Sequence, residues 1–553
     1  MKIQIAFGLA AVLSGGVAHA QVSTPAGDTT ARVDSLFARW SSRELPGCAV
    51  AVGRDGRAVL SRAYGMSDLE HNVANTPETV FEAGSVAKQF TAAAVVLLAQ
   101  QGRLSLNDPV RRYVPEVPDF GTPVLIRHLL NHTSGLRDWG TVEEVAGWPR
   151  GTRTYTHAHV LDIVSRQRAL NFPPGSQYLY SNTGYNLLAI VVERVSGMPF
   201  ARFTREQIFL PLGMEQTQWR DDYTRVVKGR AVAYAIGDDS MPHQQMPFEN
   251  VHGNGGLLTT VGDLLRWNEN FVSGRVGGRA MTDELQRQGV LTGGRRIEYA
   301  EGLVVTRYRD AAEVSHSGAT AGYRAWLARY PGQRLSVAVL CNAAQASPGG
   351  LGHAVADLFL PAIAPASASA PEANVARVTV SPAVLSTRAG LYRKRRTMEP
   401  LRIETTRGGL SVYGRPLVPL SPTRFRLGDA GLLIEFAAAP AGARAVMQVI
   451  GADGDTLAFD PVAPWTPARP AEFAGEFRSD EAEVAYTVAA DSGKLFLRGR
   501  PDVRVELTPV YADAFTTPDG WVLRFSRNGA GRVTGFGLWL DRVRDLRFAR
   551  VSR

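Results

Sequence analysis

A serine and a lysine three residues apart, Ser85 and Lys88, have the types and spacing that covalent chemistry requires. They open the apolar run "FEAGSVAKQFTAAAVVLLAQQG", from Phe81 to Gly102. Helix positions i and i+3 share one face, so the amine would lie beside the hydroxyl. A lysine can activate a serine nucleophile when burial lowers the lysine pKa from about 10 towards neutrality. The alternative, a helix-capping serine and a surface lysine, leaves a charged amine in a segment with few polar positions.

Two later motifs carry groups that could serve the same chemistry. The segment "YLYSNTGYNLL" contains Tyr180-Ser181-Asn182, which supplies a phenol and an amide. The segment "EVSHSGATAGYRAWLARYP" contains His316-Ser317-Gly318 at the end of a strand-like run. The sequence has neither His-Glu-x-x-His nor Gly-x-Ser-x-Gly, so zinc-peptidase and α/β-hydrolase mechanisms have no motif support.

The elements that must position these motifs lie in one region of mixed helix and strand, residues 28–361. A hairpin is predicted at its start, over Cys48–Gly65, and two strands around a Pro-Gly turn near its end, in "YRAWLARYP" and "RLSVAVLCN". Helices are predicted between and after them: Val86–Gly102, Tyr185–Gly197, Thr260–Gly274 and Gly350–Pro361. Strands at both ends with helices between them predict an α+β domain whose sheet gathers both ends of the region.

The three motifs resemble those of the class C β-lactamase, D-alanyl-D-alanine carboxypeptidase and D-aminopeptidase group of penicillin-binding-type serine hydrolases. The resemblance covers about residues 30–360. It extends to four further segments: "IRHLLNHTSGL" (Ile126–Leu136), "FPPGSQYLYSNTGYNLL" (Phe172–Leu188), "IFLPLGM" (Ile208–Met214) and "GNGGLLTTVGDLLRW" (Gly253–Trp267). It implies a β-lactamase/transpeptidase-like fold, in which an antiparallel sheet is flanked by helices.

The resemblance also implies a role for each matching residue. Ser85 attacks a carbonyl and becomes acylated, while Lys88 and Tyr180 share the transfer of protons. Asn182 hydrogen-bonds the amide side chain of the substrate. The backbone N–H groups of Ser85 and Ala319 form the oxyanion hole. No cofactor and no metal are expected.

The third motif departs from the β-lactamase pattern, because this chain has His316-Ser317-Gly318 where those enzymes have Lys-Thr-Gly. A histidine with a pKa near 6.5 is mostly neutral at pH 7 and becomes charged near pH 5.5. His-x-Gly resembles the D-aminopeptidases, related D-stereospecific peptidases and some esterases. We therefore expect a D-amino-acid-specific peptidase (D-aminopeptidase or DD-carboxypeptidase-like) or an esterase, acting on a small peptide, ester or β-lactam-like substrate. A true class C β-lactamase, or a non-catalytic binding or scaffold protein, is the alternative.

The remainder of the chain is an internal repeat behind an Ala/Pro/Ser-rich linker, residues 362–376. The segment "RAGLYR" matches "FAGEFR" 85 residues later, and "GGLSVYGRP" matches "GKLFLRGRP" at the same offset. Both copies consist of strand and turn sequences, which predicts two small antiparallel barrel-like domains, residues 377–465 and 466–553. The D-aminopeptidases resemble this chain in having two such barrels, one of which can reach the active site.

The first 20 residues read as a signal peptide, with Lys2, a short apolar stretch and the cleavage site "AHA" before Gln21. The mature protein is therefore expected in the periplasm or outside the cell, without a membrane anchor. A net charge of +9 over 553 residues does not indicate nucleic-acid binding. The sequence leaves the oligomeric state open.

The two cysteines, Cys48 and Cys341, lie in short apolar runs that predict buried strands. They could be two inert core thiols, or one disulfide if the protein is exported. In the fold that the chain resembles, the first strand and the last long strand are antiparallel neighbours. The resemblance therefore implies that Cys48 and Cys341 face each other and can form a disulfide.

Overall fold

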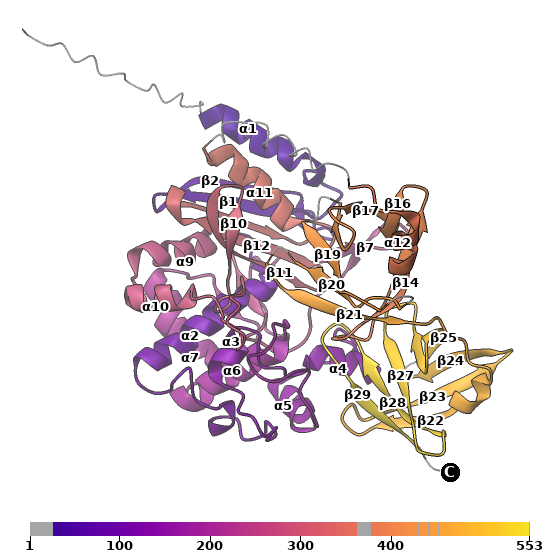
Figure 1. Cartoon of the computed structure of the whole chain (residues 1–553). Helices are drawn as coiled ribbons and strands as arrows, with labels where there is room; N and C mark the ends of the chain where they lie inside the picture. Colours follow the sequence, from indigo (N-terminus) through magenta and orange to yellow (C-terminus); the bar gives the residue numbers. More distant parts are fainter. Residues whose placement is uncertain are drawn as a thin grey trace, which may run out of the picture.

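The computed structural model describes residues 26–361, 378–428, 431–440, 443–451, 453–500 and 502–551. The predicted signal peptide (1–20) and linker (362–376) lie outside these residues, so both stay predictions. Figure 1 shows a mixed helical and β domain followed by two β-barrels, which is the predicted fold class.

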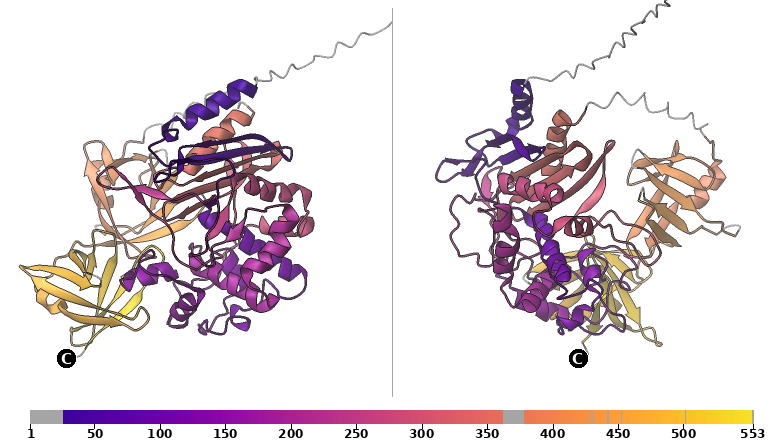
Figure 2. Two further views of the ribbon diagram at one scale, coloured as in Figure 1. Left: turned by 180° about the vertical axis from the view of Figure 1, so that it is seen from behind. Right: turned by 90° about the vertical axis from the view of Figure 1, so that its left-hand side faces the viewer.

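The first domain is built on an antiparallel sheet with the strand order β10-β11-β12-β13-β1-β2. As predicted, the sheet joins the two ends of the domain. Its strands are β1 (Cys48–Arg54), β2 (Arg57–Tyr64), β10 (Val304–Tyr308), β11 (Ala311–Thr320), β12 (Tyr323–Tyr330) and β13 (Leu335–Cys341). Helix α9 (Val261–Ser273) covers one face, and α1 (Ala26–Leu36) and α11 (Pro348–Phe359) cover the other (Figures 1 and 2).

Side chains alternate between the two helical layers along the central strands. Val50 and Val52 of β1 pack in the same cluster as residues of α1 and α11, whereas Ala49 and Ala51 pack in the cluster that contains α9. Successive strand residues point to opposite faces, so a strand covered on both sides reads as a continuous apolar run. This is why "CAVAV" and "LSVAVLC" are recognisable in the sequence as buried strands.

Cys48 and Cys341 form a disulfide between β1 and β13. They are direct partners in the antiparallel register, with Cα atoms 4.0 Å apart. The implied pairing is confirmed, and the alternative of two free thiols is wrong. The bond closes a loop that contains the sheet, the helical layer and all three sequence motifs.

The helical layer surrounds α2 (Lys88–Gln100) and α6 (Asn182–Ser196). Helix α2 is buried from Lys88 through Leu98, as its nearly all-apolar sequence requires. Helix α6 ends at Gly197, whose φ of 72° suits a glycine after a helix. The other helices of this layer are α3 (Ile126–Leu130), α4 (Trp139–Val145), α5 (His157–Ser165), α7 (Phe200–Thr204), α8 (Leu210–Leu212) and α10 (Gly278–Leu285). Across the described ranges, we find no helix with the length and apolar character that a bilayer crossing demands.

Each C-terminal repeat folds as a closed antiparallel barrel whose first strand pairs with its last. Barrel one consists of β14 (Gly390–Lys394), β15 (Pro400–Thr406), β16 (Gly409–Val412), β17 (Arg415–Pro419), β18 (Arg424–Leu427), β19 (Leu432–Phe436), β20 (Met447–Ile450) and β21 (Thr456–Val462). Barrel two consists of β22 (Gly475–Ser479), β23 (Val484–Asp491), β24 (Lys494–Gly499), β25 (Val503–Tyr511), β26 (Ala514–Thr516), β27 (Val522–Arg527), β28 (Val533–Trp539) and β29 (Leu546–Arg550).

The sequence repeat corresponds to equivalent strands of the two barrels. The segments "RAGLYR" and "FAGEFR" form their first strands, β14 and β22. The segments "GGLSVYGRP" and "GKLFLRGRP" contain the third strands, β16 and β24. Matched segments therefore occupy matched places, as expected for a structural repeat.

Candidate active site

Ser85 lies in η2 (Gly84–Ala87), a 3₁₀ turn that leads directly into α2. The turn follows β5 (Phe81–Glu82), which pairs with β9 (Leu257–Thr259). Gly84 has a φ of 51°, and a Cβ atom at this position would lie 2.6 Å from the Ala319 backbone nitrogen. Both the conformation and the lack of space require glycine here. The turn that carries Ser85 therefore lies in close contact with the backbone of β11.

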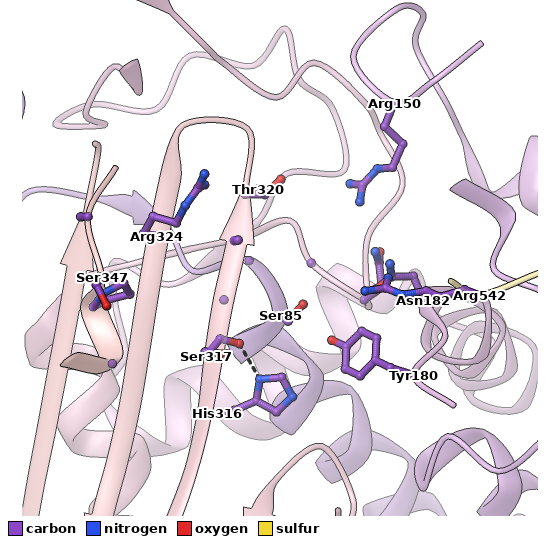
Figure 3. A pocket seen from close by; sticks show the side chains of 18 residues that line it. Ser85, Arg150, Tyr180, Asn182, His316, Ser317, Thr320, Arg324, Ser347 and Arg542 are labelled. Carbon is purple, nitrogen blue, oxygen red and sulfur yellow. Dashed lines mark hydrogen bonds between the residues drawn. The ribbon is translucent and has the colours of Figure 1, made fainter. Parts of the chain in front are cut away.

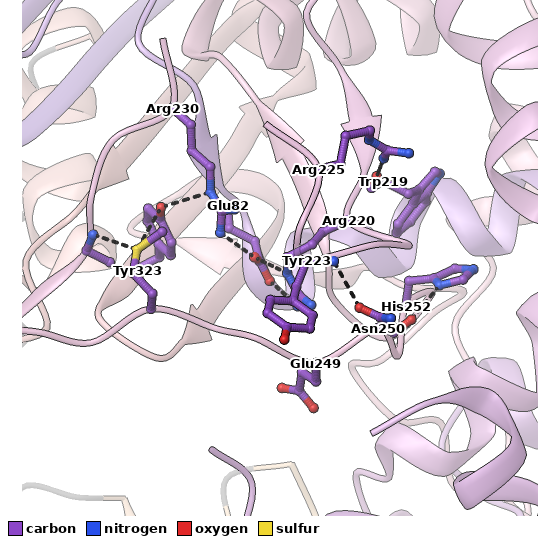
Figure 4. A network of polar contacts seen from close by, with 12 residues as sticks. Glu82, Trp219, Arg220, Tyr223, Arg225, Arg230, Glu249, Asn250, His252 and Tyr323 are labelled. Atoms are coloured by element: carbon purple, nitrogen blue, oxygen red, sulfur yellow. Dashed lines mark hydrogen bonds and ion pairs between the residues drawn. The ribbon is translucent and has the colours of Figure 1, made fainter. Parts of the chain in front are cut away.

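A buried ion pair anchors the strand that precedes Ser85 (Figure 4). The Glu82 carboxylate accepts hydrogen bonds from Arg220 Nε at 2.8 Å and Nη2 at 3.1 Å, and Arg230 Nη2 lies 3.8 Å away. Burial opposes the charge of Glu82, but Arg220 and Arg230 hold its pKa below the usual value. Removing one partner would leave an uncompensated buried charge, so the pair fixes the approach to the serine.

Lys88 is fully buried at the start of α2, and its Nζ lies 3.2 Å from Ser85 Oγ. Nζ also donates hydrogen bonds to Asn182 Oδ1 at 3.0 Å and to the Asn254 carbonyl at 2.7 Å. A neutral amine has two N–H groups and one lone pair. The two carbonyl oxygens accept the N–H groups, which leaves the lone pair for the Ser85 hydroxyl.

The electrostatic surroundings of Lys88 favour the same neutral form. Burial lowers its pKa well below the usual value of a lysine. Asp138 opposes that shift, while Arg542 and Arg150 add to it. The predicted pairing of Ser85 with a lysine of lowered pKa is therefore present in the structure.

Tyr180 supplies a phenol on the other side of the serine. Lys88 Nζ lies 4.7 Å from its ring centroid, and the Arg542 guanidinium carbon lies 5.1 Å from it. The hydroxyl is buried and points towards Ser85 (Figure 3). Burial raises the Tyr180 pKa, and Ser85 and Arg542 only partly offset this rise. Tyr180 is therefore protonated in the resting site.

The third motif forms the edge of the site on β11. A Cβ atom at Gly318 would lie 2.0 Å from the Ala83 carbonyl oxygen and 3.0 Å from the Ser85 nitrogen. Only glycine permits this approach of two backbones. The close contact brings the Ser85 turn beside the segment that carries the Ala319 N–H, which is where the oxyanion hole was expected. Ser317 alternates to the exposed side of β11 and lines the pocket.

His316 differs from expectation in one respect. It is buried, its Nδ1 lies 2.6 Å from the Ser317 carbonyl oxygen, and its Nε2 lies 2.9 Å from the Tyr299 hydroxyl. Burial, with a contribution from Lys88, lowers its pKa to about 4. The prediction of a neutral ring at pH 7 agrees with this environment. The prediction that His316 becomes charged near pH 5.5 is wrong, because the sequence did not show how completely the ring is buried.

Asn182 is the first residue of α6 and connects the second motif to the lysine. Its backbone N–H donates to Asp138 Oδ2 at 2.6 Å, while its side chain accepts from Lys88. Asp138 is itself the N-cap of α4, where its side chain accepts from the Thr141 N–H. One buried carboxylate thus fixes the starts of two helices beside the pocket.

Three of the site residues that sequence reasoning missed contact Lys88 or Tyr180. Asn254 lies in the family-like segment "GNGGLLTT", but Lys88 contacts its backbone carbonyl rather than its side chain. The ring of His132 packs against that of Tyr180 at a tilt of 36°, with centroids 4.2 Å apart, and "NHTSGL" gave no chemical signal for it. Arg542 comes from the loop between β28 and β29 of barrel two, 457 residues after Ser85. No local pattern links residues so far apart.

These groups line a pocket of about 650 Å³ with Ser85 at its centre (Figure 3). All of the predicted site residues except buried Lys88 line it, together with Asn254, Arg150, Arg324 and Arg542. A serine beside a buried amine of lowered pKa, a phenol and backbone donors around a pocket of this size are the groups that acyl transfer requires.

The geometry thus defines a serine hydrolase of the Ser-x-x-Lys type. The Beta-lactamase family model matches residues 30–359, and the chain belongs to this family. It is 29% identical to the D-aminopeptidase of Gluconobacter oxydans over 94% of this chain and 98% of that one. It is 28% identical to penicillin-binding protein 4* of Bacillus subtilis over 56% of this chain and 71% of that one.

Solved structures share the fold. The octameric penicillin-binding protein homologue from Pyrococcus abyssi superimposes with a TM-score of 0.55 at 21% identity, covering 87% of this chain and 100% of that one. The D-amino acid amidase from Ochrobactrum anthropi SV3 superimposes with a TM-score of 0.51 at 22% identity, covering 60% of this chain and 97% of that one. The first likeness extends beyond the catalytic domain, whereas the second spans a share similar to that domain alone.

Proposed function

We propose that this protein is an exported hydrolase that cleaves an amide or peptide bond next to a D-amino acid through an acyl-enzyme on Ser85. One observation carries the mechanism: the two N–H groups of a neutral Lys88 are taken by carbonyl oxygens, and Ser85 Oγ lies 3.2 Å away. The amine is therefore prepared to accept the serine proton.

Acylation begins when Ser85 Oγ attacks the substrate carbonyl carbon and its proton passes to Lys88 Nζ. The carbonyl oxygen becomes an oxyanion, which the backbone N–H groups of Ser85 and Ala319 stabilise. Lys88 is then a buried cation beside Tyr180, an arrangement that favours release of the proton towards the phenol. Tyr180 passes a proton to the leaving nitrogen, the C–N bond breaks, and the amine departs.

Deacylation follows the same route with water as the nucleophile. Water attacks the ester carbon, and Tyr180 and Lys88 carry the proton from the water to Ser85 Oγ as the C–O bond breaks. The products are the free acid and the resting enzyme. Tyr180, which is protonated at rest, acts as a relay, and Lys88 is the group that first takes the proton from the serine.

The preference for D-amino acids is supported by the relatives. The D-aminopeptidase of Gluconobacter oxydans matches both the catalytic region and the two-barrel region of this chain. Export is supported by the N-terminal sequence, and amino-terminal sequencing of the mature protein should begin at Gln21.

A labelling experiment tests the nucleophile. A fluorophosphonate probe should form an adduct on the peptide that contains Ser85, as read by mass spectrometry. Ser85→Ala should abolish labelling and lower kcat/KM by several orders of magnitude, since the covalent step is lost. Ser386→Ala, a change to an exposed serine of α12 (Pro382–Arg388), is the matched control and should label normally. Labelling at a different serine would refute the assignment, and a protein that no serine probe labels would be a binding protein.

A substrate panel tests the specificity. The D- and L-forms of one amino-acid anilide, a short-chain ester and a chromogenic cephalosporin should be compared by kcat/KM. We expect the D-anilide to be the best substrate and the cephalosporin to be poor, because a neutral His316 stands where β-lactamases have a lysine. Equal rates on both enantiomers would exclude the D-specific function, and efficient cephalosporin turnover would identify a β-lactamase.

A further inference from the structure

The walls of the active-site pocket carry an unbalanced positive charge. Arg150, Arg324 and Arg542 line it, and the described lining residues include neither aspartate nor glutamate. The three arginines come from the loop after α4, from β12 and from barrel two. Three separate parts of the chain thus bring guanidinium groups to the pocket, and none of its described lining residues is a carboxylate.

One of these arginines is neutralised by its surroundings. Arg150 Nε lies 3.0 and 3.1 Å from the two carboxylate oxygens of Glu249, an arrangement that satisfies both charges. Asp138, a buried carboxylate that does not line the pocket, accepts hydrogen bonds from the N–H groups of Asn182 and Thr141. The paired Arg150 therefore adds little to the net charge that a substrate meets, and the Asp138 carboxylate, although charged, is buried away from direct contact with it.

The other two arginines keep their charge available. Within the described residues, no carboxylate lies within ion-pair distance of Arg324, whose Nη1 donates to the carbonyls of Ala321 and Tyr323 at 2.8 Å each. Among the described residues, Asp541 is the one carboxylate within ion-pair distance of Arg542; its side chain is 83% exposed and its oxygen lies 3.3 Å from Nε. Figure 3 places Arg324 and Arg542 on either side of Ser85.

Arg542 is held in place by its backbone, so its position does not depend on its charge. Its carbonyl accepts from Asn171 Nδ2 at 3.0 Å, and the Arg544 N–H donates to Asn171 Oδ1 at 2.8 Å. Arg137 Nη2 donates to the Arg544 carbonyl at 3.0 Å. The loop is thus bound to the catalytic domain at Arg542 and at Arg544.

We propose that Arg324 and Arg542 make this pocket select substrates that carry a carboxylate and lack a free ammonium group. The inference rests on the proposed function and narrows its substrate class. It also separates this chain from relatives named D-aminopeptidases, because an N-terminal ammonium would enter a pocket whose described lining residues include no carboxylate. An uncompensated cation beside the reacting carbonyl favours an anionic substrate and repels a cationic one.

Matched substrates test the proposal. We would compare D-alanine p-nitroanilide, its N-acetyl derivative and its N-succinyl derivative, which place a positive, a neutral and a negative group at one end. N-acetyl-D-alanyl-D-alanine and its C-terminal amide make the same comparison at the other end. A charge-assisted hydrogen bond corresponds to about tenfold to hundredfold in kcat/KM. We expect kcat/KM for the anionic compound to exceed that for its neutral partner by this factor in at least one of the two comparisons. The free amine should have the lowest kcat/KM.

Variants of the two arginines test whether they cause the preference for anionic substrates. Arg542→Gln or Arg324→Gln should reduce the ratio of kcat/KM for anionic and cationic substrates by about tenfold or more. Arg542→Lys should retain most of the ratio. Arg478→Gln removes an exposed arginine of the same barrel, paired with Asp480 outside the pocket, and should leave the ratio unchanged. Because a ratio is measured, any common loss of activity cancels.

Binding to Ser85→Ala separates this proposal from the proposed function. Calorimetric titration with the same five compounds measures charge preference without turnover. If the wild-type enzyme hydrolyses only L-substrates or esters but the order of affinities remains, the function is wrong and the charge selectivity is right. If the free amine binds and reacts best, or the glutamine variants keep the wild-type ratio, the charge selectivity is wrong.

Discussion

The two C-terminal barrels have the same strand order but different relations to the active site. Barrel two buries an ion pair against the catalytic domain, with Arg137 Nη1 2.7 Å from Glu481 Oε1 and side chains 1% and 6% exposed. Barrel one meets that domain through Arg295, which pairs with Asp453 and Asp455 at 3.0 Å each in partly exposed positions. Only barrel two extends a described residue, Arg542, into the pocket. The same scaffold therefore serves as a part of the site in one copy and as a peripheral module in the other, and a loop makes the difference.

The largest expected effect is a loss of stability in the catalytic domain that leaves both barrels unchanged. The Cys48–Cys341 disulfide joins residues 293 apart, and both barrels lie outside the loop that it closes. In the chain-entropy model, a loop of that length contributes about 6 kcal/mol. The double variant Cys48→Ala/Cys341→Ala should destabilise the catalytic domain by up to that amount in calorimetric unfolding. A barrel transition that shifts equally would show that the domains unfold as one unit, and two free thiols in the denatured, unreduced wild type would exclude the bond.

Removing one partner of the Arg137–Glu481 ion pair should lower the free energy of unfolding strongly, whereas replacing both partners by apolar side chains should lower it little. Burial raises the pKa of Glu481 and lowers that of Arg137, so desolvation outweighs their attraction in both groups. Glu481→Gln leaves a buried arginine uncompensated and should destabilise the protein by about 3–5 kcal/mol. The double variant Arg137→Met/Glu481→Leu should recover most of that loss.

Thermal unfolding and activity measure both outcomes. Glu483→Ala is the control, since Glu483 pairs with Arg166 at a position where its side chain is 61% exposed. That change should alter stability by less than about 1 kcal/mol. Additive losses in the double variant of the buried pair would contradict this reasoning.

The loss of stability between pH 6.5 and pH 4 should distinguish the catalytic domain from both barrels, because histidines titrate in this window and neither barrel contains one. His316 has a pKa of about 4 in the folded protein, below its ordinary value of 6.5. The unfolded chain takes up the proton first, so stability is present above pH 6.5 and is lost as the pH falls towards 4. The full shift corresponds to about 3 kcal/mol.

The variant His316→Gln should therefore reduce the loss of stability between pH 6.5 and pH 4, as measured by urea unfolding at several pH values, while the other histidines whose pKa burial lowers, among them His128, His132 and His252, keep their contributions. It should leave the pH dependence above 6.5 unchanged. If the wild-type and variant curves run parallel through this window, His316 does not titrate there and the assigned burial is wrong.

The smallest effect is expected at the interface of barrel one. Asp455→Asn removes one carboxylate from Arg295 and Arg396, and its side chain is 26% exposed. Solvent-screened pairs of this kind contribute about 0–1 kcal/mol. Thermal unfolding should shift little and kcat/KM should stay at the wild-type value. A tenfold loss of activity would mean that barrel one, like barrel two, takes part in shaping the site.

The sequence predicted what is local or repeated. The spacing of Ser85 and Lys88 places the two side chains on one face without any tertiary information, and the repeat predicted two barrels because matched segments form matched strands. Alternation on both faces made β1 and β13 recognisable. The family resemblance, rather than spacing, implied the pairing of Cys48 with Cys341.

The rest of the site depends on contacts that no short segment encodes. Arg542 reaches Tyr180 only because the loop between β28 and β29 is bound to Asn171. The Asn254 group that holds Lys88 is a backbone carbonyl, which every residue type has. The low pKa of His316 follows from the burial of its side chain beside Tyr299, and burial is a property of the folded chain.

The contact between Gly318 and the Ala83 carbonyl has a genetic consequence. Every single-base change of a glycine codon that alters the amino acid adds side-chain atoms. A Cβ atom at Gly318 would lie 2.0 Å from that oxygen, so each of these changes pushes β11 away from the turn that carries Ser85. No amino-acid change that a single base substitution can make at position 318 should therefore be neutral. A library of random variants selected for hydrolysis should retain glycine there, whatever substrate is used for selection.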